Sequence, residues 1–176
     1  MFDERNPSEE DQLWDWHIQE LGEIGKQYPH NISVVEKGPK ELTEDWNFNC
    51  YLYVFDLHRD DEVKAINSAG NFLGRHVFRS EFVGLLLKES SEKEISQQEA
   101  KDGDLVIYFA EESSTNPEHA GIVEGEFVKS KWSYSNVYKH PTWEIPSSWG
   151  NYDRYFRNFI EDDVKKRFRG FYMSGR

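Results

Sequence analysis

Two residues of this chain are suited to nucleophilic chemistry. The sequence contains a single cysteine, Cys50, and six histidines, of which His119 opens a short apolar run. A thiol attacks only as the thiolate, which helix-end amides and a neighbouring imidazolium both favour. Asn49 can cap a helix that begins at Cys50, and a histidine entering a strand packed on that helix would supply the base. The helix-start amides could also bind an oxyanion, so the pattern predicts attack on a carbonyl carbon.

The elements that must position His119 are short strands. Residues 105–110 form an apolar run rich in β-branched and aromatic types, which predicts a buried strand after the Gly103-Asp104 pair. A polar loop, 111–118, leads to a second run that starts at His119. A turn at residues 125–126 leads to a third run, 127–132. The pattern predicts an antiparallel array with a histidine at the mouth of its second strand.

The element that must position Cys50 is a helix. The polar flank and the cap at Asn49 favour a buried helix over residues 50–58, although its Tyr, Val and Phe content would also allow a strand. Further helices are predicted at 61–67, 80–88 and 152–168. Another is predicted near the N-terminus, where apolar residues between 13 and 28 fall on one helical face, and a short extended piece is predicted at 32–35. Loops are predicted at 68–74, 90–101 and 141–150. Helices followed by a strand meander indicate an α+β single domain.

Composition excludes several classes of site. Thirty-three acidic residues against 21 lysines and arginines give a net charge of -12, which disfavours nucleic acid and anionic membrane as partners. The basic C-terminal residues are interpreted as a solvated helix face. One cysteine excludes an intrachain disulfide and a cysteine-based zinc site. No metal or cofactor is expected, because no HExxH-type spacing joins the histidines His17, His30, His58, His76, His119 and His140.

Localisation is predicted from the absence of sorting signals in the sequence. No apolar run approaches the length of a membrane span, and the first ten residues are acidic, unlike a signal peptide. The protein is therefore expected to be cytoplasmic as made, with signal-independent export left open.

The order of these motifs resembles a known family. The motifs are Asn49-Cys50, Gly103-Asp-Leu-Val106 and His119-Ala-Gly-Ile-Val123, and together they resemble the NlpC/P60 papain-like cysteine peptidases. A second set of residues looks like a little-characterised bacterial branch of that superfamily: Ser130-Lys131-Trp132, His140 and Trp149-Gly150. The resemblance covers roughly residues 46–150.

The resemblance implies a fold and an activity. It implies N-terminal helices packed on a central antiparallel sheet, with an N-terminal helical segment at 1–45, a papain-like core at 46–150 and a C-terminal helix at 151–176. It implies a Cys–His–polar triad that hydrolyses amide bonds in peptides, often cell-wall peptides, or carries out related acyl transfers. No cofactor is required for this chemistry.

Two departures from the family pattern affect the predicted site. The family usually has a serine after the cysteine, where this chain has Tyr51, so a bulky ring crowds the nucleophile. The family's third residue is commonly a histidine on the strand after the base, and its register here falls on Lys129 or Ser130. A lysine cannot accept from an imidazole N–H, so Ser130 is the structural candidate and His140 the chemical one. Both stay open.

The sequence supports three hypotheses for function. The first is a thiol hydrolase or acyltransferase in which Cys50 attacks, His119 moves the proton, Ser130 or His140 orients the imidazole, and the helix start at Asn49 supports the oxyanion. The second is a catalytically inactive papain-like binding or scaffold module. The third is a deamidase or transglutaminase-type effector. The expected partners are a peptide or protein substrate and, for an effector, a cognate inhibitor protein.

Overall fold

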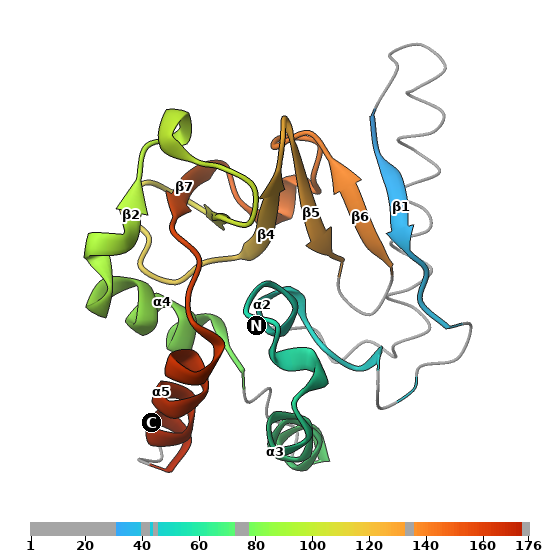
Figure 1. Cartoon of the computed structure of the whole chain (residues 1–176), viewed down its shortest axis with the longest axis vertical. Coiled ribbons are helices and arrows are strands. Elements are labelled where there is room, and N and C mark those ends of the chain that lie inside the picture. The colour runs from blue at the N-terminus through green and yellow to red at the C-terminus, as the bar shows by residue number, and fades with distance from the viewer. Residues whose placement is uncertain (1–30, 40–42, 44–45, 73–77, 133–135, 174–176) are drawn as a thin grey trace.

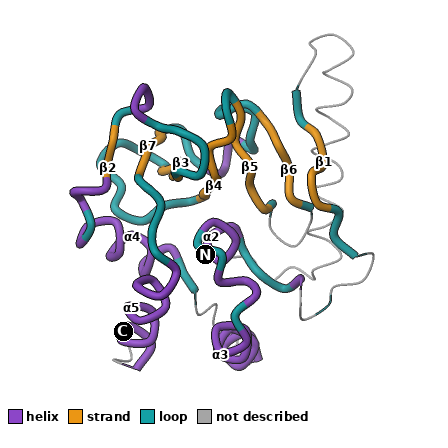
Figure 2. The backbone as a smooth tube through the Cα atoms, viewed as in Figure 1, coloured by secondary structure: helices purple, strands orange, loops and turns teal. Residues whose placement is uncertain are grey.

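The computed structural model describes residues 31–39, 43, 46–72, 78–132 and 136–173. Within them, one antiparallel sheet of seven strands has the order β1-β6-β5-β4-β3-β7-β2. The longer helices gather on one side of this sheet (Figure 2). The predicted α+β class is confirmed, whereas the N-terminal helix expected within residues 13–28 lies outside the described residues.

The strands at the centre of the sheet match the sequence pattern. The predicted runs become β3 (Leu105–Phe109), β4 (His119–Glu124) and β5 (Phe127–Lys131). The remaining strands are β1 (Ser33–Glu36), β2 (Glu94–Ile95), β6 (Val137–His140) and β7 (Tyr152–Phe156). All five residues of β3 are buried, because helices cover one face of the sheet and loops cover the other.

The two faces of the sheet have different surroundings. Successive side chains of a strand point to opposite faces. Ile107 belongs to the large hydrophobic cluster under the helices, and Tyr108 to a smaller cluster on the other face. Ile107 pairs with Ala120, and Tyr108 pairs with His119. Ala120 therefore faces the helices, and the side chain of His119 leaves β4 on the opposite face.

The helices on the first face are α2 (Cys50–Val54), α3 (Asp61–Phe72), α4 (Ser80–Glu89) and α5 (Glu161–Met173). The predicted helix at 50–58 ends early, because Asp56 adopts a left-handed backbone conformation with φ 55° before a 3-10 turn, Leu57–Arg59. The helix predicted at 61–67 continues to Phe72, so the loop expected at 68–74 is wrong over its first five residues. The helix predicted at 80–88 is confirmed.

The helix predicted at 152–168, within a helical segment 151–176, is wrong in its first part. Tyr152–Phe156 forms β7, whose five residues pair with the five residues of β3. The partner strand lies far away in the sequence, and its pairing overrides the local pattern. Helix α5 begins at Glu161, and its buried Val164 and Phe168 attach it to the large cluster.

Three basic residues of α5 are paired with acids. Lys165 pairs with Asp60, Arg169 with Glu62, and Arg167 with Glu89 at 3.0 Å. The two arginine pairs are about half exposed and add little stability each, so burial of apolar side chains anchors the helix.

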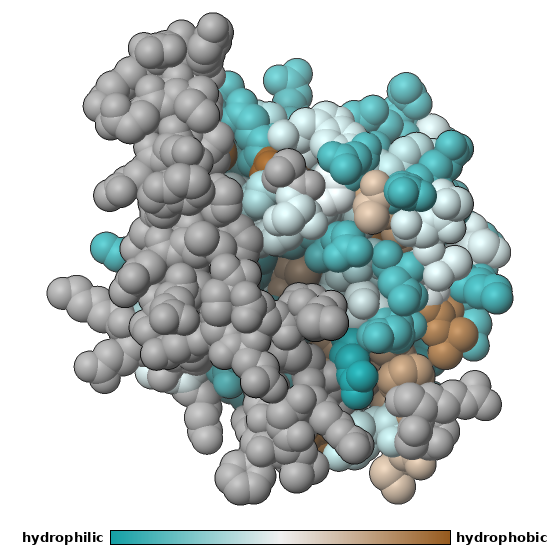
Figure 3. All heavy atoms as spheres, turned by 180° about the vertical axis from the view of Figure 1, so that it is seen from behind, coloured by the Kyte–Doolittle hydropathy of each residue, from teal (hydrophilic) through white to brown (hydrophobic). Residues whose placement is uncertain are grey.

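Hydrophilic side chains dominate the described part of the face seen in Figure 3, as the net charge of -12 leads one to expect. No helix in the described part of the chain combines the length and the apolar character needed to cross a membrane.

Candidate active site around Cys50 and His119

The predicted cap at Asn49 is confirmed. Its side-chain oxygen accepts a hydrogen bond from the backbone N–H of Leu52 at 3.0 Å, while its Nδ2 donates to the carbonyl of Phe78 at 2.8 Å. The first bond satisfies an amide at the helix start, and the second ties that start to the segment before α4. Cys50 is consequently the first residue of α2, and its position is set by the bonds of Asn49.

Helix α2 lies where β4 and β5 separate. Pairing between these strands runs from their turn to Ile122 and Lys129 and stops there. Beyond this point the two strands diverge, and α2 sits at the opening, in contact with both (Figure 1). This opening between β4 and β5 frees backbone groups that a continuous ladder would have used.

The sulfur of Cys50 uses that opening. The backbone N–H groups of Ala120, Tyr51 and Cys50 itself favour the charged form of this sulfur. The N–H of Ala120 belongs to the peptide bond that follows His119. The structure thus brings the thiol to the backbone of the predicted base, although the two residues are far apart in the sequence.

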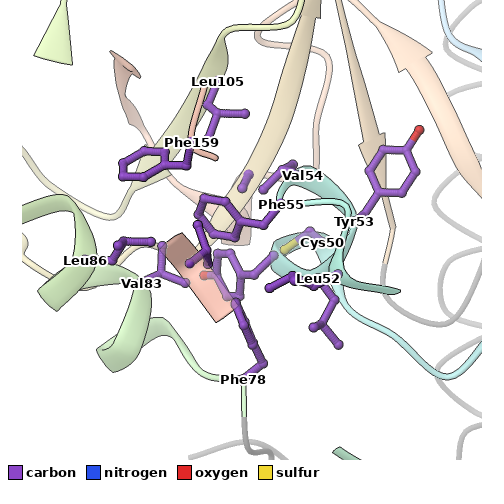
Figure 4. Packing of buried hydrophobic residues seen from close by; sticks show 14 of the residues in the cluster. Cys50, Leu52, Tyr53, Val54, Phe55, Phe78, Val83, Leu86, Leu105 and Phe159 are labelled. Carbon is purple, nitrogen blue, oxygen red and sulfur yellow. The ribbon is translucent and has the colours of Figure 1, made fainter. Parts of the chain in front are cut away.

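Burial opposes ionisation of the thiol. Cys50 is only 8% exposed and packs among hydrophobic side chains of α2 and its neighbours (Figure 4). This burial raises the pKa of the Cys50 thiol to about 12, against the backbone N–H groups and the charge of Lys131, which lower it. The thiol is therefore protonated at neutral pH.

Tyr51, expected to crowd the nucleophile, has a structural role. Its hydroxyl donates to the carbonyl of Pro117 at 2.6 Å, which fastens α2 to the loop preceding β4. The ring is buried, and burial raises the pKa of the Tyr51 hydroxyl well above its ordinary value. Tyr51 is consequently a neutral neighbour of the sulfur.

His119 is held on the opposite face of β4. Its ring stacks on Trp149 with centroids 4.2 Å apart and lies 5.7 Å from the ring of Tyr108. The residue is 2% exposed, and its Nε2 has no hydrogen-bond partner among the described residues. Burial, reinforced by nearby His140, holds the pKa of His119 well below its usual range, so the imidazole is neutral.

Ser130 and His140, the two candidates for the orienting residue, bond to each other. Ser130 Oγ lies 2.8 Å from His140 Nε2, and His140 Nδ1 lies 2.8 Å from the carbonyl of Pro141. A carbonyl only accepts, so Nδ1 carries the proton and Nε2 accepts from the Ser130 hydroxyl. Trp132 Nε1 donates to the same hydroxyl at 2.9 Å. Burial lowers the pKa of His140 to about 4, so this network is neutral.

The side chains of the predicted triad are therefore not brought together among the described residues. Cys50 meets the backbone beside His119, but among the described residues no hydrogen bond joins its thiol to an imidazole, nor either orienting candidate to His119. The physical reason is strand alternation, which directs Ala120 toward α2 and His119 away from it.

Sequence reasoning missed Lys131. It is fully buried on the α2 face of β5, opposite Val137, and its Nζ lies 5.1 Å from the ring centroids of both Trp46 and Phe48. A signal was available, because Trp46 and Phe48 lie four and two residues before Cys50, and the alternation of β5 puts Lys131 on the face opposite Ser130.

No group of three or more His, Cys, Asp or Glu side chains within the described residues is placed to hold a metal ion. Comparison with known proteins adds no assignment: no family model, no curated protein and no solved structure matches the chain. The NlpC/P60 resemblance stays a prediction.

Proposed function

We propose that this protein is a papain-like thiol hydrolase or acyltransferase of the NlpC/P60 type that acts on amide bonds. Cys50 is the nucleophile and His119 the base. One observation carries the proposal: α2, which begins at Cys50, contacts β4 and β5 where their pairing stops, and the peptide N–H that follows His119 favours the charged form of the Cys50 sulfur.

The chemistry follows the usual course for a thiol nucleophile. His119 takes the thiol proton, the sulfur bonds to the substrate carbonyl carbon, and the carbonyl oxygen becomes an oxyanion. The amides at the Asn49–Cys50 helix start are placed to stabilise this charge. His119 then gives the proton to the leaving nitrogen, which departs and leaves a thioester. Water completes hydrolysis, and an amine completes acyl transfer.

The resting state sets a requirement on this mechanism. Thiol and imidazole are both buried and neutral, so the thiolate forms by general-base transfer during reaction and not as a preformed ion pair. The ring of His119 stacks on Trp149 on the other face of β4, so the mechanism requires the first residue of this strand to rearrange and bring the imidazole to the sulfur. Substrate binding must supply the energy for this movement.

The test compares product formation by wild type, Cys50→Ala and His119→Ala. The substrates are a mixture of bacterial cell-wall peptides and a random peptide library, both read by mass spectrometry. Either substitution should lower the rate by about a thousandfold or more. The matched control is His58→Ala, which removes a half-buried histidine that stacks on Phe48 rather than lying beside the thiol. Products that persist in Cys50→Ala would refute the proposal.

A catalytically inactive papain-like binding module is the second candidate. The closed site favours it, because Cys50 is 8% and His119 2% exposed and the expected thiol–imidazole bond is absent from the described site. Reactivity with iodoacetamide separates the two. If His119→Ala does not change the alkylation rate of Cys50 and no Cys50-dependent product forms from the peptide mixtures, the binding module is correct.

Deamidation and transglutamination use the same atoms with a glutamine side chain as substrate. Release of ammonia from glutamine-containing proteins, dependent on Cys50, would assign the protein to that reaction instead of peptide hydrolysis.

A further inference from the structure

Lys131 is a fully buried lysine on β5, a strand that contacts α2, the helix that begins at the only cysteine of the chain. Its neighbours on the α2 face of the sheet are Trp46 and Phe48, four and two residues before Cys50. A lysine is almost never fully buried unless it has compensating interactions, and aromatic faces at this distance provide one. The aromatic pair therefore holds the ammonium close to the start of α2.

The charges around the sulfur make Lys131 distinctive. Three backbone N–H groups and Lys131 are the groups that favour the charged form of Cys50. The other titratable neighbours, Tyr51 on α2 and His119 on β4, are neutral at physiological pH. The carboxylates of Glu81 and Glu118 act on the hydroxyl of Tyr51.

We propose that Lys131 is a positioning residue whose ammonium group stabilises the Cys50 thiolate from the side of β5. Its value for catalysis rests on the proposed function, whereas its effect on thiol reactivity does not. The two roles then belong to neighbouring strands: β4 carries the base that removes the proton, and β5 carries the charge that stabilises the sulfur anion. A charge in such a low-dielectric site acts more strongly than it would in water.

Alkylation by iodoacetamide measures this effect without any substrate. The thiolate sulfur bonds to the methylene carbon, iodide leaves, and the rate follows the thiolate fraction. We expect Lys131→Met to lower the rate about tenfold throughout the pH range in which the rate rises with pH, equivalent to about one pKa unit. Lys131→Arg should restore most of the loss, because it retains the charge.

The matched control is Lys129→Met. Lys129 lies two residues earlier on the same face of β5, is partly exposed, and pairs with Glu124 at 3.7 Å. Cys50 in the Lys129→Met variant should be alkylated at the wild-type rate. A folded Lys131→Met protein that also reacts at the wild-type rate would overturn the proposal and leave Lys131 a purely structural residue.

The proposal stays testable if Lys131→Met fails to fold, although replacing a buried charge by an apolar side chain is often neutral or stabilising. Lys131→Gln, which removes the charge and keeps most of the side-chain length, should then alkylate about tenfold more slowly than the wild type. A folded Lys131→Gln protein that alkylates at the wild-type rate overturns the proposal.

The outcomes separate the two proposals. Slower alkylation of Lys131→Met without any Cys50-dependent hydrolysis by the wild type would refute only the proposed enzyme function. Hydrolysis by wild type with unchanged alkylation of Lys131→Met would refute only the role of Lys131.

Discussion

Replacing Ser130 by alanine should destabilise the fold without impairing the thiol. The hydroxyl is fully buried, accepts from Trp132 Nε1 and donates to His140 Nε2. Ser130→Ala leaves that donor and that acceptor unsatisfied, each at a cost of about 1–3 kcal/mol, so we expect a loss of about 2–5 kcal/mol. The removed oxygen is too small for water to take its place without a shift of the surrounding rings.

Urea unfolding, followed by far-ultraviolet circular dichroism and tryptophan fluorescence, measures this loss. Ser91→Ala removes an exposed hydroxyl and should change the free energy of unfolding by less than about 0.5 kcal/mol. A loss below about 1 kcal/mol for Ser130→Ala would refute the network described above. If that variant were stable but alkylated slowly at Cys50, Ser130 would act as the orienting residue after all.

Two further predictions concern the same region. Gly150→Ala should lower the free energy of unfolding by about 1–3 kcal/mol, measured by thermal unfolding, because Gly150 has φ 122° and an added Cβ would lie 2.7 Å from the carbonyl oxygen of Phe109. The control is Gly170→Ala, where an added Cβ would have no neighbour within 4 Å. Stability should also fall on acidification from pH 6.5 toward pH 4, since burial lowers the pKa of His140 to about 4 and the unfolded chain binds the proton first. His140 alone accounts for about 3 kcal/mol over this range, and His140→Asn should flatten the profile measured by urea titration; an unchanged slope would contradict it.

The sequence pattern predicted the elements whose signal is local. The apolar runs of β3, β4 and β5, the turn at Gly125 and the cap at Asn49 all follow from neighbouring residues, and they agree with the structure. Tyr152–Phe156 has an aromatic and charged pattern that suits a helix face equally well. This segment is a strand only because it pairs with β3, and that pairing cannot be read from the residues of the segment itself.

The geometry between the predicted site residues could not be read from the sequence. Residue order predicts that Cys50 and His119 share a site, whereas the structure brings the thiol near the backbone beside His119 and puts the imidazole on the other face of β4. Alternation shows that His119 and Ala120 point to opposite faces, but not which face the helix covers. Lys131 was missed for a related reason: a lysine in a strand is normally solvated, and only the aromatic pair at Trp46 and Phe48 makes its burial favourable.

The opening between β4 and β5 has a consequence for folding kinetics. The hairpin of these strands closes through its own short turn and can form early, whereas α2 must arrive from a distant part of the chain. We expect the unpaired N–H of Ala120 to meet Cys50 only in a late step. Pulse-labelling of the single thiol during refolding would then measure when α2 docks, since the thiol should become protected only after the sheet has formed.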